Sequence, residues 1–191
     1  MEQFIVSARK YRPQTFKDVV GQQTITSTLV NAIENNHLAQ ALLFTGPRGV
    51  GKTTCARILA RKINQIGYDD PNIRNLIDQV RIPPQTGIYK VYIIDEVHML
   101  SSAAFNAFLK TLEEPPKHAI FILATTEKHK IIPTILSRCQ IFDFKRITVN
   151  DAKEYLKEVA VSQNITFEDD ALQIIAQKAD GAMRDALSIF D

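Results

Sequence analysis

Four short apolar segments along the chain each predict a strand that is buried on both faces of a sheet. Continuous apolar runs without alternating polar positions are typical of parallel strands covered by helices on both sides. The segments are 41–44, 91–94, 120–124 and, more weakly, 140–144. We therefore expect a central parallel sheet.

Between these segments, apolar residues recur at the three- and four-residue spacing of amphipathic helices. Such patterns occur at 25–33, after residue 52 and over 102–114. The last helix should end there, because Pro115 and Pro116 follow and proline cannot continue a helix. Alternating strands and helices predict a three-layer α/β domain whose ligands lie at the carboxyl ends of the strands.

After residue 146 the strand pattern ends and only helical patterns follow. Three helical segments are expected, at about 151–162, 169–179 and 182–190. We therefore divide the chain into an α/β domain, 1–146, and a small helical domain, 147–191. Because a domain of this size buries only a marginal core by itself, we expect the second domain to pack against the first.

One connection does not fit an ordinary sheet of this class. A parallel crossover should return through a further strand before 91–94, yet the segment 64–70 is poor material for one. Either the connection is unusually short, or residues of the biological chain are missing from this sequence.

The composition of the chain excludes few classes of function. The 191 residues are 45% hydrophobic and contain no apolar stretch long enough to cross a membrane, so a cytoplasmic location is expected. Cys55 and Cys139 show neither a metal-binding spacing nor a disulfide framework, and we interpret them as packing residues. A net charge of +2 gives no bulk argument for nucleic-acid binding, although Arg9, Lys10 and Arg12 form a local basic cluster.

The segment 46–53 fits the phosphate-loop pattern G-x-x-x-x-G-K-[ST] and lies between a predicted strand and a predicted helix. Its backbone N–H groups should surround phosphate, with Lys52 neutralising charge and Thr53 binding Mg²⁺. Asp95 and Glu96 follow the second strand, where Asp95 would hold Mg²⁺ through water and Glu96 would polarise an attacking water. The sequence therefore predicts Mg-ATP binding.

Several polar residues outside the loop extend this pattern. Thr126 ends a buried strand and is placed to bond the γ-phosphate or the attacking water. Arg138 precedes a strand, and Arg184 lies near the start of the third helix of the second domain. His98 lies just beyond the acidic pair, but we interpret it as a structural residue because Glu96 already fills the role of base.

Together these motifs resemble the AAA+ clamp-loader ATPases over nearly the whole chain. The segments that carry the resemblance are Arg-Lys-Tyr-Arg-Pro at 9–13, Ile-Asp-Glu-Val-His-Met-Leu at 94–100, Leu-Glu-Glu-Pro-Pro at 112–116, Ser-Arg-Cys at 137–139 and Gly-Ala-Met-Arg-Asp-Ala at 181–186. The resemblance implies an α/β P-loop NTPase fold of the AAA+ type with a central parallel sheet, followed by a three-helix lid.

The resemblance also implies roles for individual residues. Adenine and ribose would be lined by Arg9, Tyr11, Arg12, Pro13, Val19 and Val20. The phosphates would be held by Gly46, Pro47, Arg48, Gly49, Val50, Gly51, Lys52, Thr53 and Thr54. Mg²⁺ would be held by Thr53 and Asp95, and the catalytic set would be Lys52, Glu96, Thr126, Arg138 and Arg184. In this set Arg138 is an arginine finger acting on the neighbouring subunit, and Arg184 is a sensor of the subunit's own γ-phosphate.

The chain departs from the family in two places. A four-cysteine zinc module and a following strand usually stand where this sequence has 64–70, so we expect no zinc in this sequence as given. The family's helical collar domain should follow the lid, yet the sequence ends at Asp191. We therefore expect the isolated fragment to be monomeric or weakly associated, and to hydrolyse ATP slowly.

The implied function is that of an ATP-hydrolysing motor subunit. With its partner subunits it would load a sliding clamp onto primer-template DNA in a nucleoid-associated replisome. One alternative is a branch-migration helicase, which should carry a DNA-pulling hairpin between Lys117 and Ile131. Another is a nucleotide-bound scaffold that does not hydrolyse ATP, which the intact Lys52, Glu96 and Arg138 disfavour. Nothing in the sequence resembles a nucleotidyl-transfer site.

Overall fold

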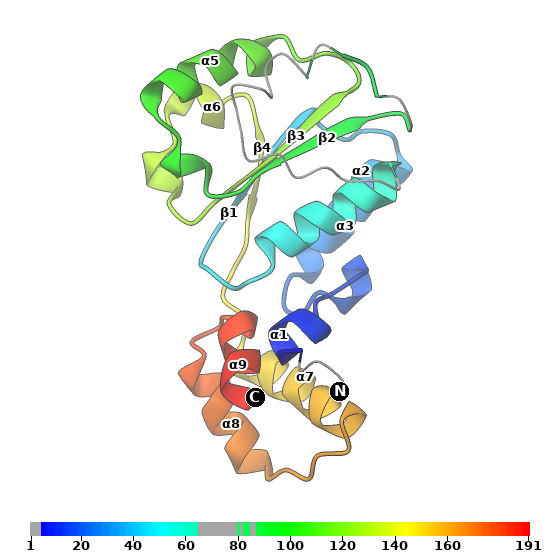
Figure 1. Cartoon of the computed structure of the whole chain (residues 1–191), viewed down its shortest axis with the longest axis vertical. Coiled ribbons are helices and arrows are strands. Elements are labelled where there is room, and N and C mark those ends of the chain that lie inside the picture. The colour runs from blue at the N-terminus through cyan, green and yellow to red at the C-terminus, as the bar shows by residue number, and fades with distance from the viewer. Residues whose placement is uncertain (1–4, 65–79, 81, 85–86) are drawn as a thin grey trace.

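A four-stranded parallel sheet forms the centre of the larger part of the molecule (Figure 1). The computed structural model describes residues 5–64, 80, 82–84 and 87–191. Within these residues the strand order is β2-β3-β1-β4, and every neighbouring pair is parallel. The strands are β1 (Ala41–Thr45), β2 (Lys90–Ile94), β3 (Ala119–Thr125) and β4 (Gln140–Asp143). The predicted central parallel sheet is therefore confirmed.

Helices cover both faces of this sheet, which explains why its inner strands are continuously apolar. On β1, Leu42 and Phe44 pack into the core under α2 and α3, while Leu43 packs into the opposite core under α5 and α6. These helices are α2 (Gln23–Glu34), α3 (Lys52–Asn64), α5 (Ser102–Glu113) and α6 (Pro133–Leu136). The edge strand β4 differs from our expectation of a buried strand, because only its Phe142 is buried.

An aromatic cluster around Phe121 lies in the core under α5. Phe121 is fully buried, stacks on Tyr92 with ring centroids 5.4 Å apart, and meets the ring of Phe108 edge-on at 5.2 Å. We expect Phe121→Ala to lower the free energy of unfolding by about 3–5 kcal/mol, because it leaves a cavity between two rigid layers. Urea denaturation measures this loss. Phe121→Leu is the control and should lose much less, and equal stability of both variants and the wild type would contradict the packing described.

Short elements connect the main ones and shape the carboxyl edge of the sheet. They are α1 (Ser7–Lys10) and the 3₁₀ turns η1 (Phe16–Asp18), η2 (Val97–Met99) and η3 (Lys128–Lys130). A serine caps the start of α5, since Ala104 N donates to Ser101 Oγ at 3.3 Å. The helix behind it ends at Glu113, just before the two prolines.

The second part of the chain is a bundle of three helices, as the sequence predicted. They are α7 (Val149–Ser162), α8 (Asp169–Lys178) and α9 (Met183–Phe190). Their shared core contains Leu156, Leu172 and Leu187. Because β4 ends at Asp143 and α7 begins at Val149, we keep the domain boundary between 146 and 147 as a proposal.

The N-terminal segment joins the helical bundle to the sheet domain. Figure 1 places α1 against α9 and α7, far from it in the sequence. Ser7 N donates to Asp191 Oδ2 at 2.8 Å, and the hydroxyl of Tyr155 donates to the carbonyl of Tyr11 at 2.8 Å. The lid and the residues expected to surround the base therefore form one structural unit.

Two expectations concern other parts of the chain. The irregular connection at 64–70 lies outside the described residues, apart from the last residue of α3. Among the helices that the structure describes, none is long and apolar enough to span a membrane.

Candidate nucleotide-binding site

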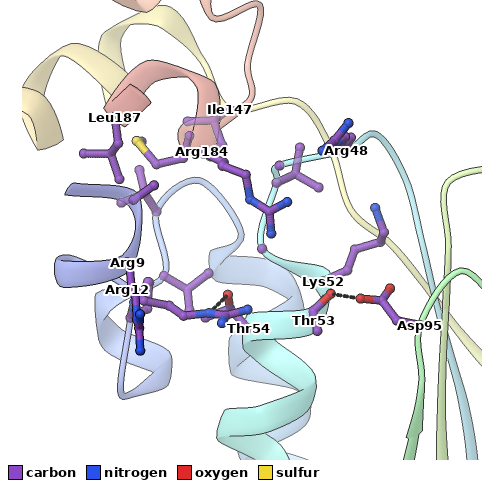
Figure 2. Close-up of a pocket in the computed structure, with 18 of the residues that line it drawn as sticks. Arg9, Arg12, Arg48, Lys52, Thr53, Thr54, Asp95, Ile147, Arg184 and Leu187 are labelled. Carbon is purple, nitrogen blue, oxygen red and sulfur yellow. Dashed lines mark hydrogen bonds between the residues drawn. The ribbon is translucent and has the colours of Figure 1, made fainter. Parts of the chain in front are cut away.

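A cavity of about 980 Å³ lies where the phosphate loop, the N-terminal segment and the lid meet (Figure 2). Its volume is in the range of ligand-binding pockets. The structure brings most of the sequence-predicted residues to its wall: Arg9, Tyr11, Arg12, Pro13, Val19, Val20, Arg48, Gly49, Val50, Gly51, Lys52, Thr53, Thr54, Asp95, Glu96, Thr126 and Arg184. Gly46 and Pro47 line an adjoining pocket with Thr126, and Arg138 lines neither.

The phosphate loop takes a backbone course that only glycine adopts easily at its first position. Gly46 has φ +133°, and a Cβ there would overlap the carbonyl oxygen of Phe144. Gly49 has φ +77°, and a Cβ there would lie 2.9 Å from the Cβ of Ala182 in the lid. The loop therefore lies between two parts of the chain: the segment that joins β4 to α7, which contains Phe144, and the lid, which contains Ala182.

Lys52 is the buried cation of the loop. Its side chain donates to the carbonyls of Gly46 at 2.7 Å and Pro47 at 2.6 Å, and the residue is only 6% exposed. Burial lowers the pKa of Lys52 and nearby Arg184 adds to this effect, whereas the charges of Glu96 and Asp95 oppose it. An anion in the cavity would favour the charged form of Lys52.

Asp95 and Thr53 present oxygen atoms to the same point of the cavity. The Thr53 hydroxyl donates to Asp95 Oδ2 at 2.8 Å, and Asp95 Oδ1 accepts from the backbone of Glu96 at 3.0 Å. In the described ranges no three His, Cys, Asp or Glu side chains gather to hold a metal. One carboxylate and one hydroxyl fit Mg²⁺, which proteins bind through one or two carboxylates together with substrate phosphates.

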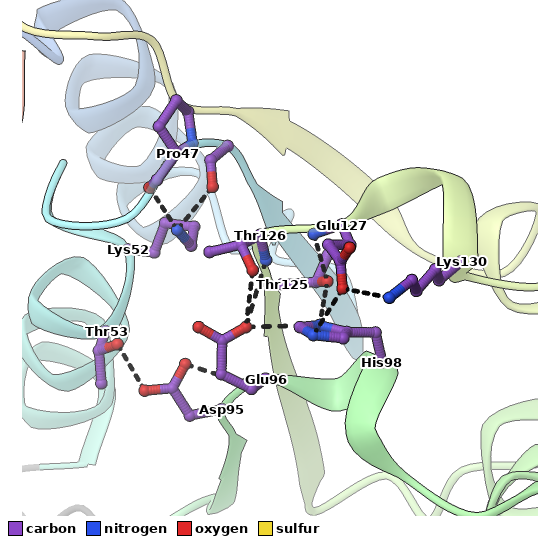
Figure 3. Close-up of polar contacts among 11 residues, drawn as sticks. Pro47, Lys52, Thr53, Asp95, Glu96, His98, Thr125, Thr126, Glu127 and Lys130 are labelled. Atoms are coloured by element: carbon purple, nitrogen blue, oxygen red, sulfur yellow. Dashed lines mark hydrogen bonds and ion pairs between the residues drawn. The ribbon is translucent and has the colours of Figure 1, made fainter.

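Glu96 is held in an unusual backbone conformation next to Thr126 (Figure 3). Its φ of 47° and ψ of 47° lie in the left-handed region, at the start of η2. Such conformations cost about 1–3 kcal/mol and cluster at functional sites. The Glu96 Oε2 atom accepts from Thr126 N at 3.3 Å and from the Thr126 hydroxyl at 3.1 Å. Thr125, by contrast, is fully buried, so Thr126 is the member of the pair that faces the cavity.

The two arginines of the predicted catalytic set lie on different sides of the molecule. Arg184, near the start of α9, points toward the phosphate loop in Figure 2. Arg138, between α6 and β4, instead donates to the carbonyl of Thr134 at 2.8 Å and to Glu113 Oε1 at 2.9 Å. Arg138 is therefore engaged elsewhere and does not line this chain's own cavity.

Several cavity residues were not predicted as site residues. Tyr155, Met183 and Leu187 come from the lid and Ile147 from the segment between β4 and α7, while Val6, Ala8, His98 and Met99 complete the wall. In the sequence, most of these apolar positions look like ordinary core residues. The basic cluster at the N-terminus, by contrast, is visible in the sequence. In the structure its Arg12 reaches the phosphate loop, where Nε donates to the Thr54 hydroxyl at 3.3 Å (Figure 2).

The cysteines behave as packing residues. Cys55 is fully buried in α3, and burial raises the pKa of its thiol to about 12. Cys139 is partly buried, and burial raises the pKa of its thiol to about 11. Neither thiol is prepared for reaction, because the reactive form is the thiolate.

A phosphate loop after β1, an acidic pair after β2 and an arginine from a helical lid, all built on one parallel sheet, define a P-loop NTPase domain of the AAA+ type. Residues 21–70 and 64–148 match the family described as "DNA polymerase III, delta subunit", and 151–191 match "DNA polymerase III clamp loader subunit, ATPase lid domain". The chain therefore belongs to the clamp-loader subunits of DNA polymerase III, and its relatives among them are the gamma and tau subunits.

Three curated relatives illustrate this. The chain is 47% identical to the tau subunit of Bacillus subtilis over 96% of this chain and 38% of that protein. It is 43% identical to the tau subunit of Escherichia coli over 97% of this chain and 34% of that protein. It is 41% identical to the gamma subunit of Buchnera aphidicola subsp. Baizongia pistaciae over 96% of this chain and 58% of that protein. The chain thus spans only about a third to three fifths of these relatives.

These matches also bear on the irregular connection. The Bacillus subtilis alignment is 215 residues long, whereas 96% of this 191-residue chain is about 183 residues, so roughly 30 positions of the relative have no counterpart here. The delta-subunit family matches this chain in two separate ranges, which overlap at 64–70. Both findings agree with the expectation that this sequence is short between α3 and β2.

Solved structures support the fold class. The chain resembles the Holliday junction branch migration motor RuvB of Thermotoga maritima, with a TM-score of 0.77 and 25% identity over 94% of this chain and 64% of that chain. A second structure of the same protein gives a TM-score of 0.78 over the same shares.

Proposed function

We propose that this chain binds and hydrolyses Mg-ATP as a motor subunit of the DNA polymerase III clamp loader. With other clamp-loader subunits, in the cytoplasmic replisome at the nucleoid, it loads a sliding clamp onto primer-template DNA. One observation carries the proposal: Lys52, Asp95, Glu96, Thr126 and Arg184 surround one cavity, and the predicted finger Arg138 lies outside it.

Different parts of the cavity bind different parts of Mg-ATP in this proposal. The base and ribose lie between the N-terminal segment and the lid, against Val19, Ile147 and Leu187. The phosphates lie against the loop and Lys52. Mg²⁺, when bound, is held by Thr53 and Asp95 and neutralises negative charge on the phosphates.

Hydrolysis needs a polarised water and positive charge near the transferred phosphoryl group. Glu96 activates the water, Thr126 orients Glu96, and Arg184 contacts the γ-phosphate from the lid. Arg138 completes the site of the neighbouring subunit. ATP shifts the assembly between conformations because these contacts differ between them.

The likeness to RuvB motivates a second candidate, a branch-migration motor. Between Lys117 and Ile131, however, the chain contains only β3 and η3, without an inserted hairpin. Identity to the gamma and tau subunits, at 41–47%, also exceeds the 25% identity to RuvB. A scaffold that binds ATP without hydrolysing it is the third possibility.

The discriminating experiment is steady-state ATPase activity of the full-length protein assembled with its partner subunits. We expect strong stimulation when sliding clamp and primed DNA are both present, because the assembly hydrolyses ATP to release the loaded clamp. Phosphate release, with clamp alone and DNA alone as controls, measures it. Hydrolysis indifferent to the clamp would indicate another AAA+ machine, and tight binding without hydrolysis would indicate a scaffold.

A further inference from the structure

His98 lies behind the acidic pair, in the turn η2, with its side chain only 7% exposed. It reaches across from the end of β2 to the end of β3 (Figure 3). A buried imidazole beside a carboxylate that activates water has a direct effect on that carboxylate, since each ring nitrogen donates or accepts a hydrogen bond.

The far side of the imidazole is fixed by a chain of polar contacts. Its Nε2 atom lies 3.1 Å from Glu127 Oε2, and the same carboxylate oxygen lies 2.7 Å from the ammonium of Lys130. The backbone N–H of Glu127 donates to the Thr125 hydroxyl at 3.0 Å. Glu127, itself held by Lys130 and Thr125, therefore fixes the far side of the ring.

The near side of the imidazole faces Glu96. His98 Nδ1 lies 2.9 Å from the Thr125 hydroxyl and 3.4 Å from Glu96 Oε2. Thr126 donates twice to that same oxygen. In the described part of the chain, every polar side-chain contact of Glu96 thus goes to Oε2. The other oxygen points away from His98, toward the side on which Lys52 and Thr53 lie (Figure 3).

We propose that His98 is a positioning residue for Glu96. Its Nδ1, hydrogen-bonded to the Thr125 hydroxyl, lies 3.4 Å from Glu96 Oε2 and limits the movement of that oxygen, which the two donors of Thr126 fix, so that the other oxygen is presented to the attacking water. The inference rests on the proposed ATPase function, because Glu96 is the group through which His98 acts. It assigns no proton transfer from substrate or water to His98 itself.

Two substitutions distinguish the contributions of the two ring nitrogens. In His98→Asn the amide nitrogen takes the approximate place of Nδ1, and in His98→Gln it takes that of Nε2. His98→Gln therefore keeps the contact to Glu127 and loses those to Thr125 and Glu96, whereas His98→Asn does the reverse. If His98 had only a structural role, both variants would lose stability. If it positions Glu96, the two variants differ in kcat.

The test is performed on the full-length protein in the assembled complex with clamp and primed DNA. We expect His98→Gln to lower kcat by about 10- to 100-fold, since small misplacement of a catalytic group has effects of this size. Its Kd for ATP should stay within about twofold, and His98→Asn should recover most of kcat. Equal kcat in His98→Gln and wild type, or parallel losses in both variants matched by lost ATP binding, would overturn the inference. Absence of hydrolysis in the wild-type complex would overturn the proposed function and this inference with it.

Discussion

Replacing Arg138 with alanine is expected to lower the ATPase rate of the assembled complex by about 10³- to 10⁵-fold, the usual contribution of an arginine finger. The same variant should bind ATP normally, because Arg138 does not line its own cavity. In the isolated chain the guanidinium contacts Thr134 and Glu113. Both contacts are exposed and weak, so a neighbouring γ-phosphate competes with them readily.

The experiment compares three variants in the same assembly. ATP binding is measured by nucleotide fluorescence, and hydrolysis by phosphate release with clamp and primed DNA present. Arg138→Lys keeps the charge but loses the planar two-pronged donor, so it should recover only part of the rate. Glu113→Gln removes the carboxylate that pairs with the proposed finger in the isolated chain and should leave the rate high. Loss of ATP binding in Arg138→Ala would place the arginine in its own site and refute the assignment in trans.

The sequence was sufficient to predict the sheet because buried parallel strands follow a local pattern, and the phosphate site is predicted from a local pattern too. Buried parallel strands are continuously apolar, so β1 and β3 were evident, and the spacing of the loop encodes its own turn and helix start. The exposed edge strand β4 was harder to predict correctly, because only Phe142 is buried on it.

The remainder of the site depends on contacts between residues distant in the sequence. Tyr155 bonds the carbonyl of Tyr11 across 144 positions, and no local pattern reports such a contact. The left-handed backbone of Glu96 and the packing of His98 between two carboxylates also arise from the end of β3 lying beside the end of β2. Sequence reasoning interpreted His98 as structural because Glu96 already filled the role of base, and its partners Thr125 and Glu127 are distant in the sequence.

Glu96→Gln is expected to lower hydrolysis by about 10²- to 10⁴-fold, the usual contribution of a positioned general base, and to leave ATP affinity within about twofold. The amide keeps the size of the side chain, and its carbonyl oxygen still accepts from Thr126, so the cavity should retain its shape. It cannot accept a proton from water.

Binding and hydrolysis must be measured on the same preparation, because only their separation identifies the role of Glu96. Lys52→Ala provides the opposite control, since it removes the buried cation of the phosphate loop and should weaken ATP binding itself. A Glu96→Gln complex that binds ATP but does not turn it over should hold the clamp without releasing it onto DNA. Turnover equal to the wild type would mean that a group other than Glu96 activates the water, and His98 would then lose its proposed role as well.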